Sequence, residues 1–192
     1  HSSGGQIAIV HNGIIENYQE LKAELEQKQH RFDTETDTEI VAHLVTDYLQ
    51  QGLDPVAAAK ASFARLEGAY ALVLIFAGEH ELMIGARQGT PMTIGYGEGE
   101  NAGSMYLASD AVALAAYTNK VCYLEDGDWT VIRRSGAEIF RLYLFQRSAG
   151  ESQLCHHACQ PARQYAMAAQ PDRRRRRWRR ALFDLAGGRG ER

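Results

Sequence analysis

Two short segments of the 192-residue sequence carry groups that could do chemistry on a small polar molecule. In the first, His11-Asn12-Gly13 follows an apolar run, residues 6–10, that we interpret as a strand. A tight turn there would expose the Gly13 amide and the Asn12 side chain together. Preorganised donors of this kind stabilise an oxyanion as negative charge develops. Asn12 and Gly13 are therefore candidate catalytic residues, although a purely structural turn would explain the same residues.

The second segment is Thr36-Asp37-Thr38-Glu39, which has the form of a helix capping box. Asp37 would then lie in the first helical turn, where the backbone dipoles favour a carboxylate. A carboxylate that also faces a pocket could bind an ammonium group, which makes Asp37 a candidate substrate-binding residue. A purely electrostatic role at the start of the helix is the alternative that the pattern leaves open.

The elements that must carry these residues change in character along the chain. Apolar spacing predicts a helix from Asn17 and an amphipathic helix after the capping box, with one apolar stripe along it. A third helix is predicted with Asp54 as its N-cap and Pro55 as its first residue, running to about Leu66. The later apolar runs predict strands at 70–76, 81–86, 92–96, 105–108, 121–124 and 129–133, with a turn at 125–128. Helices followed by a strand meander favour an α+β fold, with helices packed on largely antiparallel sheet.

The charge divides the chain near residue 140. Residues 1–140 hold 9 Lys and Arg against 20 Asp and Glu, whereas residues 141–192 hold 12 Arg against 4 acids. The resulting net charges of −11 and +8 sum to the −3 of the whole chain. The net negative charge of residues 1–140 disfavours binding to a phosphate backbone. No apolar run approaches the roughly 20 residues of a transmembrane helix.

Targeting and cysteine content point to one compartment. The start of the sequence has neither the basic region nor the apolar region of a secretory signal. Three cysteines are an odd and sparse set, which argues against a disulfide framework. We therefore expect a cytoplasmic protein.

The two segments extend into longer motifs. HNGIIENYQELKAEL at 11–25 and FDTETDTEIVAHL at 32–44 resemble the glutaminase domain of the glutamine–fructose-6-phosphate aminotransferase family. These proteins are class II amidotransferases of the N-terminal-nucleophile hydrolase superfamily. The similarity continues through LEGAYALVLI (66–75), ARQGTPMTIGYGEGE (86–100), LASD (107–110) and LEDGD (124–128), and it ends at GAEIF (136–140).

The resemblance implies a four-layer αββα sandwich that hydrolyses the side-chain amide of L-glutamine. Asn12 and Gly13 correspond to the family's oxyanion hole, and Asp37 corresponds to the carboxylate that binds the α-amino group; Gly13 also borders the substrate. Neither a metal nor a cofactor is implied. The released ammonia would pass to sugar-isomerase domains, where fructose 6-phosphate becomes glucosamine 6-phosphate, and the full-length enzyme would be a homo-oligomer.

The sequence departs from the family at both ends. The family's nucleophile is an N-terminal cysteine whose own α-amino group acts as the base, whereas this chain begins with His1. We therefore expect residues 1–140 to form a sandwich that is incomplete at its N-terminal edge and inactive by itself. Residues 141–192 would be a disordered or out-of-frame tail. Resequencing the DNA across codons 138–145 tests the frameshift hypothesis, because an intact frame excludes it.

Three alternative interpretations rest on other features. The domain could be a nucleophile-free module that binds glutamine or docks on a partner. In the tail, Cys155, His156, His157 and Cys159 are potential zinc ligands, but a second ligand pair is missing from the motif. The block Arg173–Arg177 with Trp178, Arg179 and Arg180 could bind nucleic acid, although such blocks are more often solvated arms. Cys122 lies in an apolar strand and is interpreted as a core residue.

Overall fold

A computed structural model describes residues 5–142 and 160–161 of the chain. The first strand, β1 (Ile7–Ile15), is followed by three helices, α1 (Tyr18–Gln27), α2 (Asp37–Gln50) and α3 (Pro55–Phe63). The later elements are β2 (Gly68–Phe76), β3 (Met83–Gln88), β4 (Thr93–Tyr96), the 3₁₀ helix η1 (Gly99–Asn101), β5 (Met105–Ala108), α4 (Ala111–Leu114), β6 (Lys120–Tyr123), β7 (Asp128–Arg133), β8 (Gly136–Arg141) and β9 (Gln160–Pro161). This arrangement confirms the predicted α+β class.

The strands form two antiparallel sheets. Sheet A has the order β1-β2-β3-β7-β8, and sheet B has the order β5-β4-β6-β9. β1 pairs with β2 along its whole length, from Ile7 opposite Phe76 to Ile15 opposite Gly68. Within the part of the chain that the structure describes, β1 is therefore an edge strand of sheet A, with its second edge unpaired.

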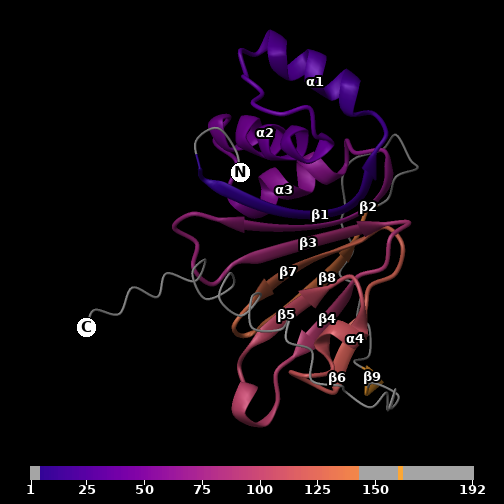
Figure 1. The fold of residues 1–192 in the computed structure, drawn as a ribbon. Helices are drawn as coiled ribbons and strands as arrows, with labels where there is room; N and C mark the ends of the chain where they lie inside the picture. The colour runs from indigo at the N-terminus through magenta and orange to yellow at the C-terminus, as the bar shows by residue number, and fades with distance from the viewer. Residues whose placement is uncertain (1–4, 143–159, 162–192) are drawn as a thin grey trace. The chain divides into compact units, whose positions relative to one another are not determined.

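The helices and the two sheets form stacked layers (Figure 1), and two hydrophobic cores lie between them. The first lies between α1–α3 and one face of sheet A, and its buried members include Ile15, Leu44, Phe63 and Trp129. The second lies between the two sheets and includes Cys122, as predicted for that residue. Burying these aliphatic and aromatic side chains is the main favourable contribution to the fold.

The fourth layer is a single helical turn. Leu114 of α4 is buried and lies beside Gly95 of β4, where it covers the side of sheet B that faces away from sheet A. Ile94, the neighbour of Gly95, points the other way into the core between the sheets. The layers therefore follow the expected order αββα, with α4 as a short outer layer (Figure 1).

The helix signals in the sequence have different outcomes. Asp54 caps α3 as predicted, because its carboxylate accepts hydrogen bonds from the Val56 amide at 2.9 Å and the Ala57 amide at 3.1 Å. Pro55 occupies the first helical position, where the missing N–H costs nothing. The apolar stripe predicted for α2 is buried, and its members include Ile40, Val41, Leu44 and Val45.

The predicted capping box at the start of α2 is wrong in its hydrogen bonds. Thr36 is the N-cap residue by position, but its hydroxyl pairs with the Thr34 hydroxyl at 2.9 Å. Glu39 instead turns back to the preceding loop and accepts from the Asp33 amide at 2.8 Å and the Thr34 amide at 2.7 Å. The loop is thereby tied to the helical turn that carries Asp37.

Two strands were not predicted. β8 forms a hairpin with β7, and Phe140 stacks on Trp129 with ring centroids 4.6 Å apart. β9 pairs with β6, with Pro161 opposite Lys120.

None of the helices in the described ranges has both the length and the apolar character needed to cross a bilayer.

Gly68 provides a test of how closely β1 and β2 approach each other. It has φ +122°, and an added Cβ would lie 2.3 Å from the Ile14 carbonyl oxygen. Because the strands would have to separate, we expect Gly68→Ala to lower the free energy of unfolding by about 2–4 kcal/mol. Gly78→Ala is the matched control, since Gly78 has φ +87° but open space around it, and it should cost about 1 kcal/mol. Urea unfolding of both variants measures the difference, and equal losses would contradict the steric explanation.

Candidate functional site

The segment His11-Asn12-Gly13 is not a turn, so this prediction is wrong. β1 continues through it to Ile15, in uninterrupted register with β2. Gly13 is nevertheless a special position, because it has φ +122° and a Cβ there would lie 2.1 Å from the Ala69 carbonyl oxygen. The close approach of the two strands therefore requires glycine, although the backbone does not reverse direction.

Neighbouring residues of this segment lie on opposite faces of sheet A. Asn12 pairs with Ala71, a member of the core between the sheets, so Asn12 lies on that face. His11 pairs with Leu72, a member of the core under the helices. Asn12 and Gly13 are both exposed.

Asp37 is the first residue of α2, and its carboxylate reaches the end of β1. Its Oδ2 accepts a hydrogen bond from the Ile15 amide at 2.9 Å, and its Oδ1 lies 3.6 Å from His11 Nδ1. The Asp37 side chain is 24% exposed. The structure thus brings Asp37 to the same strand as Asn12 and Gly13, with solvent access to the carboxylate.

The direction of the amides shows which edge of β1 is involved. The Glu16 amide donates to the Glu67 carbonyl beside β2, whereas the Ile15 amide donates to Asp37. In an antiparallel pair the N–H groups of successive residues point to opposite sides. By this alternation we expect the Gly13 amide to point to the free edge, like that of Ile15, about 7 Å further back along the strand.

His11 and Thr38 form a second link between β1 and α2, which sequence reasoning missed. His11 Nδ1 lies 2.9 Å from Thr38 Oγ1, and the His11 side chain is only 4% exposed. Burial lowers the pKa of His11, although the Asp37 carboxylate acts in the opposite direction. Both residues adjoin predicted site residues within the HNG and ETDTE motifs, and that adjacency was the available signal.

Asn17 fixes the far end of β1. Its side-chain amide donates to the Arg65 carbonyl at 2.8 Å, and its carbonyl accepts from the Glu67 amide at 3.1 Å. Arg65 also pairs with Glu24 of α1, and these hydrogen bonds, helped by Lys28, lower the pKa of Glu24 to about 2. The strand end that receives Asp37 is therefore held by α1 and by the loop before β2.

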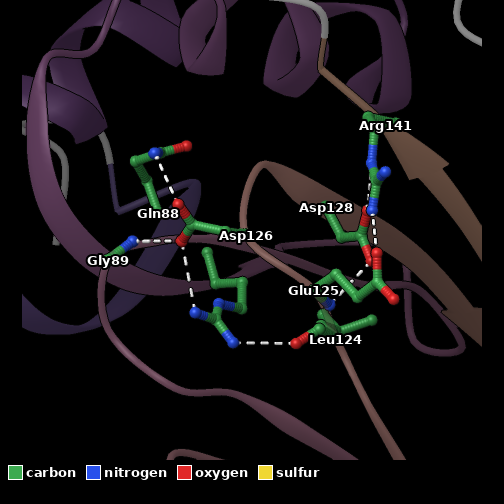
Figure 2. Close-up of polar contacts among 8 residues, drawn as sticks. Gln88, Gly89, Leu124, Glu125, Asp126, Asp128 and Arg141 are labelled. Atoms are coloured by element: carbon green, nitrogen blue, oxygen red, sulfur yellow. Dashed lines mark hydrogen bonds and ion pairs between the residues drawn. The ribbon is translucent and has the colours of Figure 1, made fainter.

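A separate polar cluster supports the neighbouring strands (Figure 2). Asp126 accepts hydrogen bonds from the Gly89 amide, from Gln88 Nε2 at 3.0 Å and from Arg87 Nη2 at 3.2 Å. Arg87 also donates to the Leu124 carbonyl at 2.8 Å. These contacts join the end of β3 to the turn before β7, in the ARQGTPM and LEDGD motifs.

This cluster reaches the candidate site through Tyr70. Gly89 forms a bridge with Tyr70, which lies directly opposite Gly13. Burial, followed by the charge of Asp126, raises the pKa of Tyr70 to about 12. Tyr70 is therefore a neutral, buried residue on β2, paired with Gly13 of β1.

The structure bears on the possible metal site only within the residues that it describes. Within the described residues, no three His, Cys, Asp or Glu side chains converge as a metal site. The possible zinc ligands at 155–159 and the arginine block at 173–180 lie outside those residues.

A groove of about 390 Å³ runs over α1 and is lined by Tyr18, Gln19, Lys22, Ala23, Glu26 and Glu35.

Comparison with known proteins places the chain among amidotransferases. The profile of the glutamine amidotransferase domain matches residues 1–116, more than half of the chain. A glutamine–fructose-6-phosphate aminotransferase (isomerizing) of Bradyrhizobium diazoefficiens is 58% identical over 135 residues, covering 70% of this chain and 22% of that protein. The Gluconobacter oxydans protein of the same name is 55% identical over 145 residues, covering 71% and 23%. The chain thus spans about a fifth of these relatives' length.

Solved structures show the same fold. A glutamine phosphoribosylpyrophosphate amidotransferase from B. subtilis superposes with a TM-score of 0.58 at 30% identity, covering 73% of this chain and 30% of that one. A glutamine aminotransferase class-II domain protein from Silicibacter pomeroyi has a TM-score of 0.55 at 16% identity, covering 73% and 69%. At that identity the second likeness concerns the fold alone.

Glu39 allows a test of the loop that precedes Asp37. Burial raises the pKa of the Glu39 carboxyl, but hydrogen bonds from the Thr34 side chain and from the Asp33 and Thr34 amides outweigh burial and bring it to about 2. Since the unfolded chain titrates near 4.5, this carboxylate stabilises the fold fully above that pH and loses its contribution as the pH falls towards 2.

We therefore expect Glu39→Gln to lower the free energy of unfolding by about 1–3 kcal/mol at pH 7. The difference from the parent should shrink as the pH falls from 4.5 towards 2. Glu35→Gln, an exposed acid in the same loop, is the control and should change little. Denaturant unfolding over this pH range is the measurement, and a difference independent of pH would contradict the assignment.

Proposed function

This chain belongs to the glutamine amidotransferase domain family, and we propose that Asn12, Gly13 and Asp37 bind L-glutamine for hydrolysis of its side-chain amide. Asp37 would bind the α-ammonium group of the substrate. Asn12 and Gly13 would donate hydrogen bonds to the oxygen of the amide under attack. The reaction class is acyl transfer, with release of ammonia.

The observation that carries this proposal is the position of the Asp37 carboxylate at the free edge of β1. The Ile15 amide fixes one carboxylate oxygen, and the partly exposed side chain leaves room for a cationic partner. Charge-assisted hydrogen bonds between an ammonium group and a carboxylate are among the stronger polar interactions in proteins. A fixed carboxylate at an open strand edge is therefore suited to an amino acid's α-ammonium group.

The spacing along β1 supports the proposed hydrogen bonds from Asn12 and Gly13 to the substrate's side-chain amide. Two residues of strand place the Gly13 amide about 7 Å from the Ile15 amide that holds Asp37. The amide carbon and the α-nitrogen of extended glutamine are about 5 Å apart by ordinary bond lengths. Since β1 is an edge strand among the described strands, a ligand along this edge could contact Asn12 from one face and Asp37 from the other.

An attacking cysteine would have to come from outside the described residues. Cys122 is the single cysteine that the structure describes, and it is buried between the two sheets. It therefore cannot reach a ligand at the edge of β1. The described residues would bind and polarise the substrate, and a nucleophile placed beside them would complete the reaction.

The names of the relatives suggest what a longer protein containing this chain would do. Proteins that share more than half of the aligned residues are called glutamine–fructose-6-phosphate aminotransferases. We propose that the ammonia serves amination of fructose 6-phosphate in a sugar-isomerase part of such a protein, acting as a homo-oligomer.

Asp37→Asn tests the binding role directly. Asparagine can still accept the Ile15 hydrogen bond but has no charge, so we expect affinity for L-glutamine to fall about 10- to 100-fold. Affinity for 4-carbamoylbutanoate, which lacks the α-amino group, should be unchanged. Isothermal titration calorimetry of the chain with both ligands provides the comparison.

Asp33→Asn is the matched control, because Asp33 is an exposed acid in the loop before α2. It should bind both ligands like the parent. An Asp37→Asn variant that keeps its preference for L-glutamine over 4-carbamoylbutanoate would contradict the proposed function.

A further inference from the structure

We propose that His11 is a positioning residue, a neutral imidazole that links β1 to the first turn of α2 and forms no ion pair with Asp37. The inference rests on the proposed role of Asp37 in binding the substrate's ammonium group. His11 would contact only protein groups, and its effect on the substrate would pass through Asp37.

The contacts of His11 place it directly behind the carboxylate. Its Nδ1 lies 2.9 Å from Thr38 Oγ1 and 3.6 Å from Asp37 Oδ1. Asp37 and Thr38 are the first two residues of α2, so one ring nitrogen meets both of them. Together with the bond from Ile15 to Asp37, this contact joins β1 to the helix start at two points.

The tautomer follows from the charge of the neighbour. If Nδ1 carried a lone pair, that lone pair would lie beside the Asp37 carboxylate and would be repelled by it. An Nδ1–H is attracted by the same carboxylate and can donate to the Thr38 hydroxyl. Nε2 then bears the lone pair, and among the described residues it has no hydrogen-bond partner.

Neutrality of the ring matters for the substrate. An imidazolium 3.6 Å from Asp37 would form an ion pair with it and would compete with the substrate's ammonium group. The ring is almost completely buried, and burial disfavours the cation. Asp37 is the acidic residue beside the ring, and the neighbouring Thr38 carries no charge. The substrate is thus the cation that completes the site.

The Thr38 hydroxyl offers the cleanest test, with a conservative rescue. Thr38→Val keeps the shape of the side chain but removes the partner of His11, whereas Thr38→Ser keeps the hydroxyl. The readout is the ratio of the affinities for L-glutamine and 4-carbamoylbutanoate, measured on the chain by calorimetry. A loss of general stability would weaken both ligands alike and would leave this ratio unchanged.

We expect Thr38→Val to lower the ratio about three- to tenfold, in keeping with the loss of one hydrogen bond that positions a charge. Thr38→Ser should keep the ratio of the parent. If Thr38→Val does not fold, His11→Asn and His11→Leu replace it. Asparagine can place an N–H donor near the position of Nδ1 and should preserve the ratio, whereas leucine should lower it.

The outcomes separate this inference from the proposed function. If Asp37→Asn removes the preference for L-glutamine while Thr38→Val and His11→Leu keep it, the positioning role is wrong and the proposed function stands. If Asp37→Asn keeps the preference, the proposed function fails, and the inference about His11 fails with it.

Discussion

The hydrogen bond from the Ile15 amide to the Asp37 carboxylate is the contact on which the candidate site depends. It joins the edge strand of sheet A to the first residue of α2 across 22 positions of sequence. Without it, the carboxylate would be one of several acidic side chains around the start of α2. With it, the charge has a fixed place at the edge of β1 that pairs with no other described strand.

The surroundings of that contact keep the charge available. His11 is buried and neutral, so it orients the helix start without forming an ion pair with Asp37. Glu39 accepts hydrogen bonds from the Asp33 and Thr34 amides, which holds the loop beside the helix. Tyr70 and the Asp126 cluster support the strand opposite Gly13. These contacts join the edge of β1 to α2, to the loop before α2 and to β2.

Local signals predicted the elements that depend on local physics. The apolar stripe of α2 and the Asp54 cap of α3 follow from spacing and from one side chain next to its own helix. The HNG turn was wrong because pairing with β2, more than 50 residues later, keeps the segment extended. The capping box was wrong because Glu39 found better partners in the preceding loop. In the first case a tertiary contact overrode a local preference, whereas in the second one set of local hydrogen bonds replaced another.

The same distinction applies to the site. Asn12, Gly13 and Asp37 were predicted first from residue type and position and then from motif resemblance, and both motifs lie within the matched residues 1–116. The contact between His11 and Thr38 could not be predicted, because 27 residues separate the two and their partnership depends on how α2 docks against β1.

Amide chemical shifts during a titration with L-glutamine would test the central claim most directly. In a spectrum of the ¹⁵N-labelled chain, we expect the largest changes at the amides of Gly13 and Ile15, at the free edge of β1. The des-amino analogue 4-carbamoylbutanoate should perturb Gly13 but leave Ile15 and Asp37 nearly unchanged. Changes confined to the groove over α1, around Lys22 and Glu26, or no changes at millimolar ligand, would contradict a glutamine site at this edge.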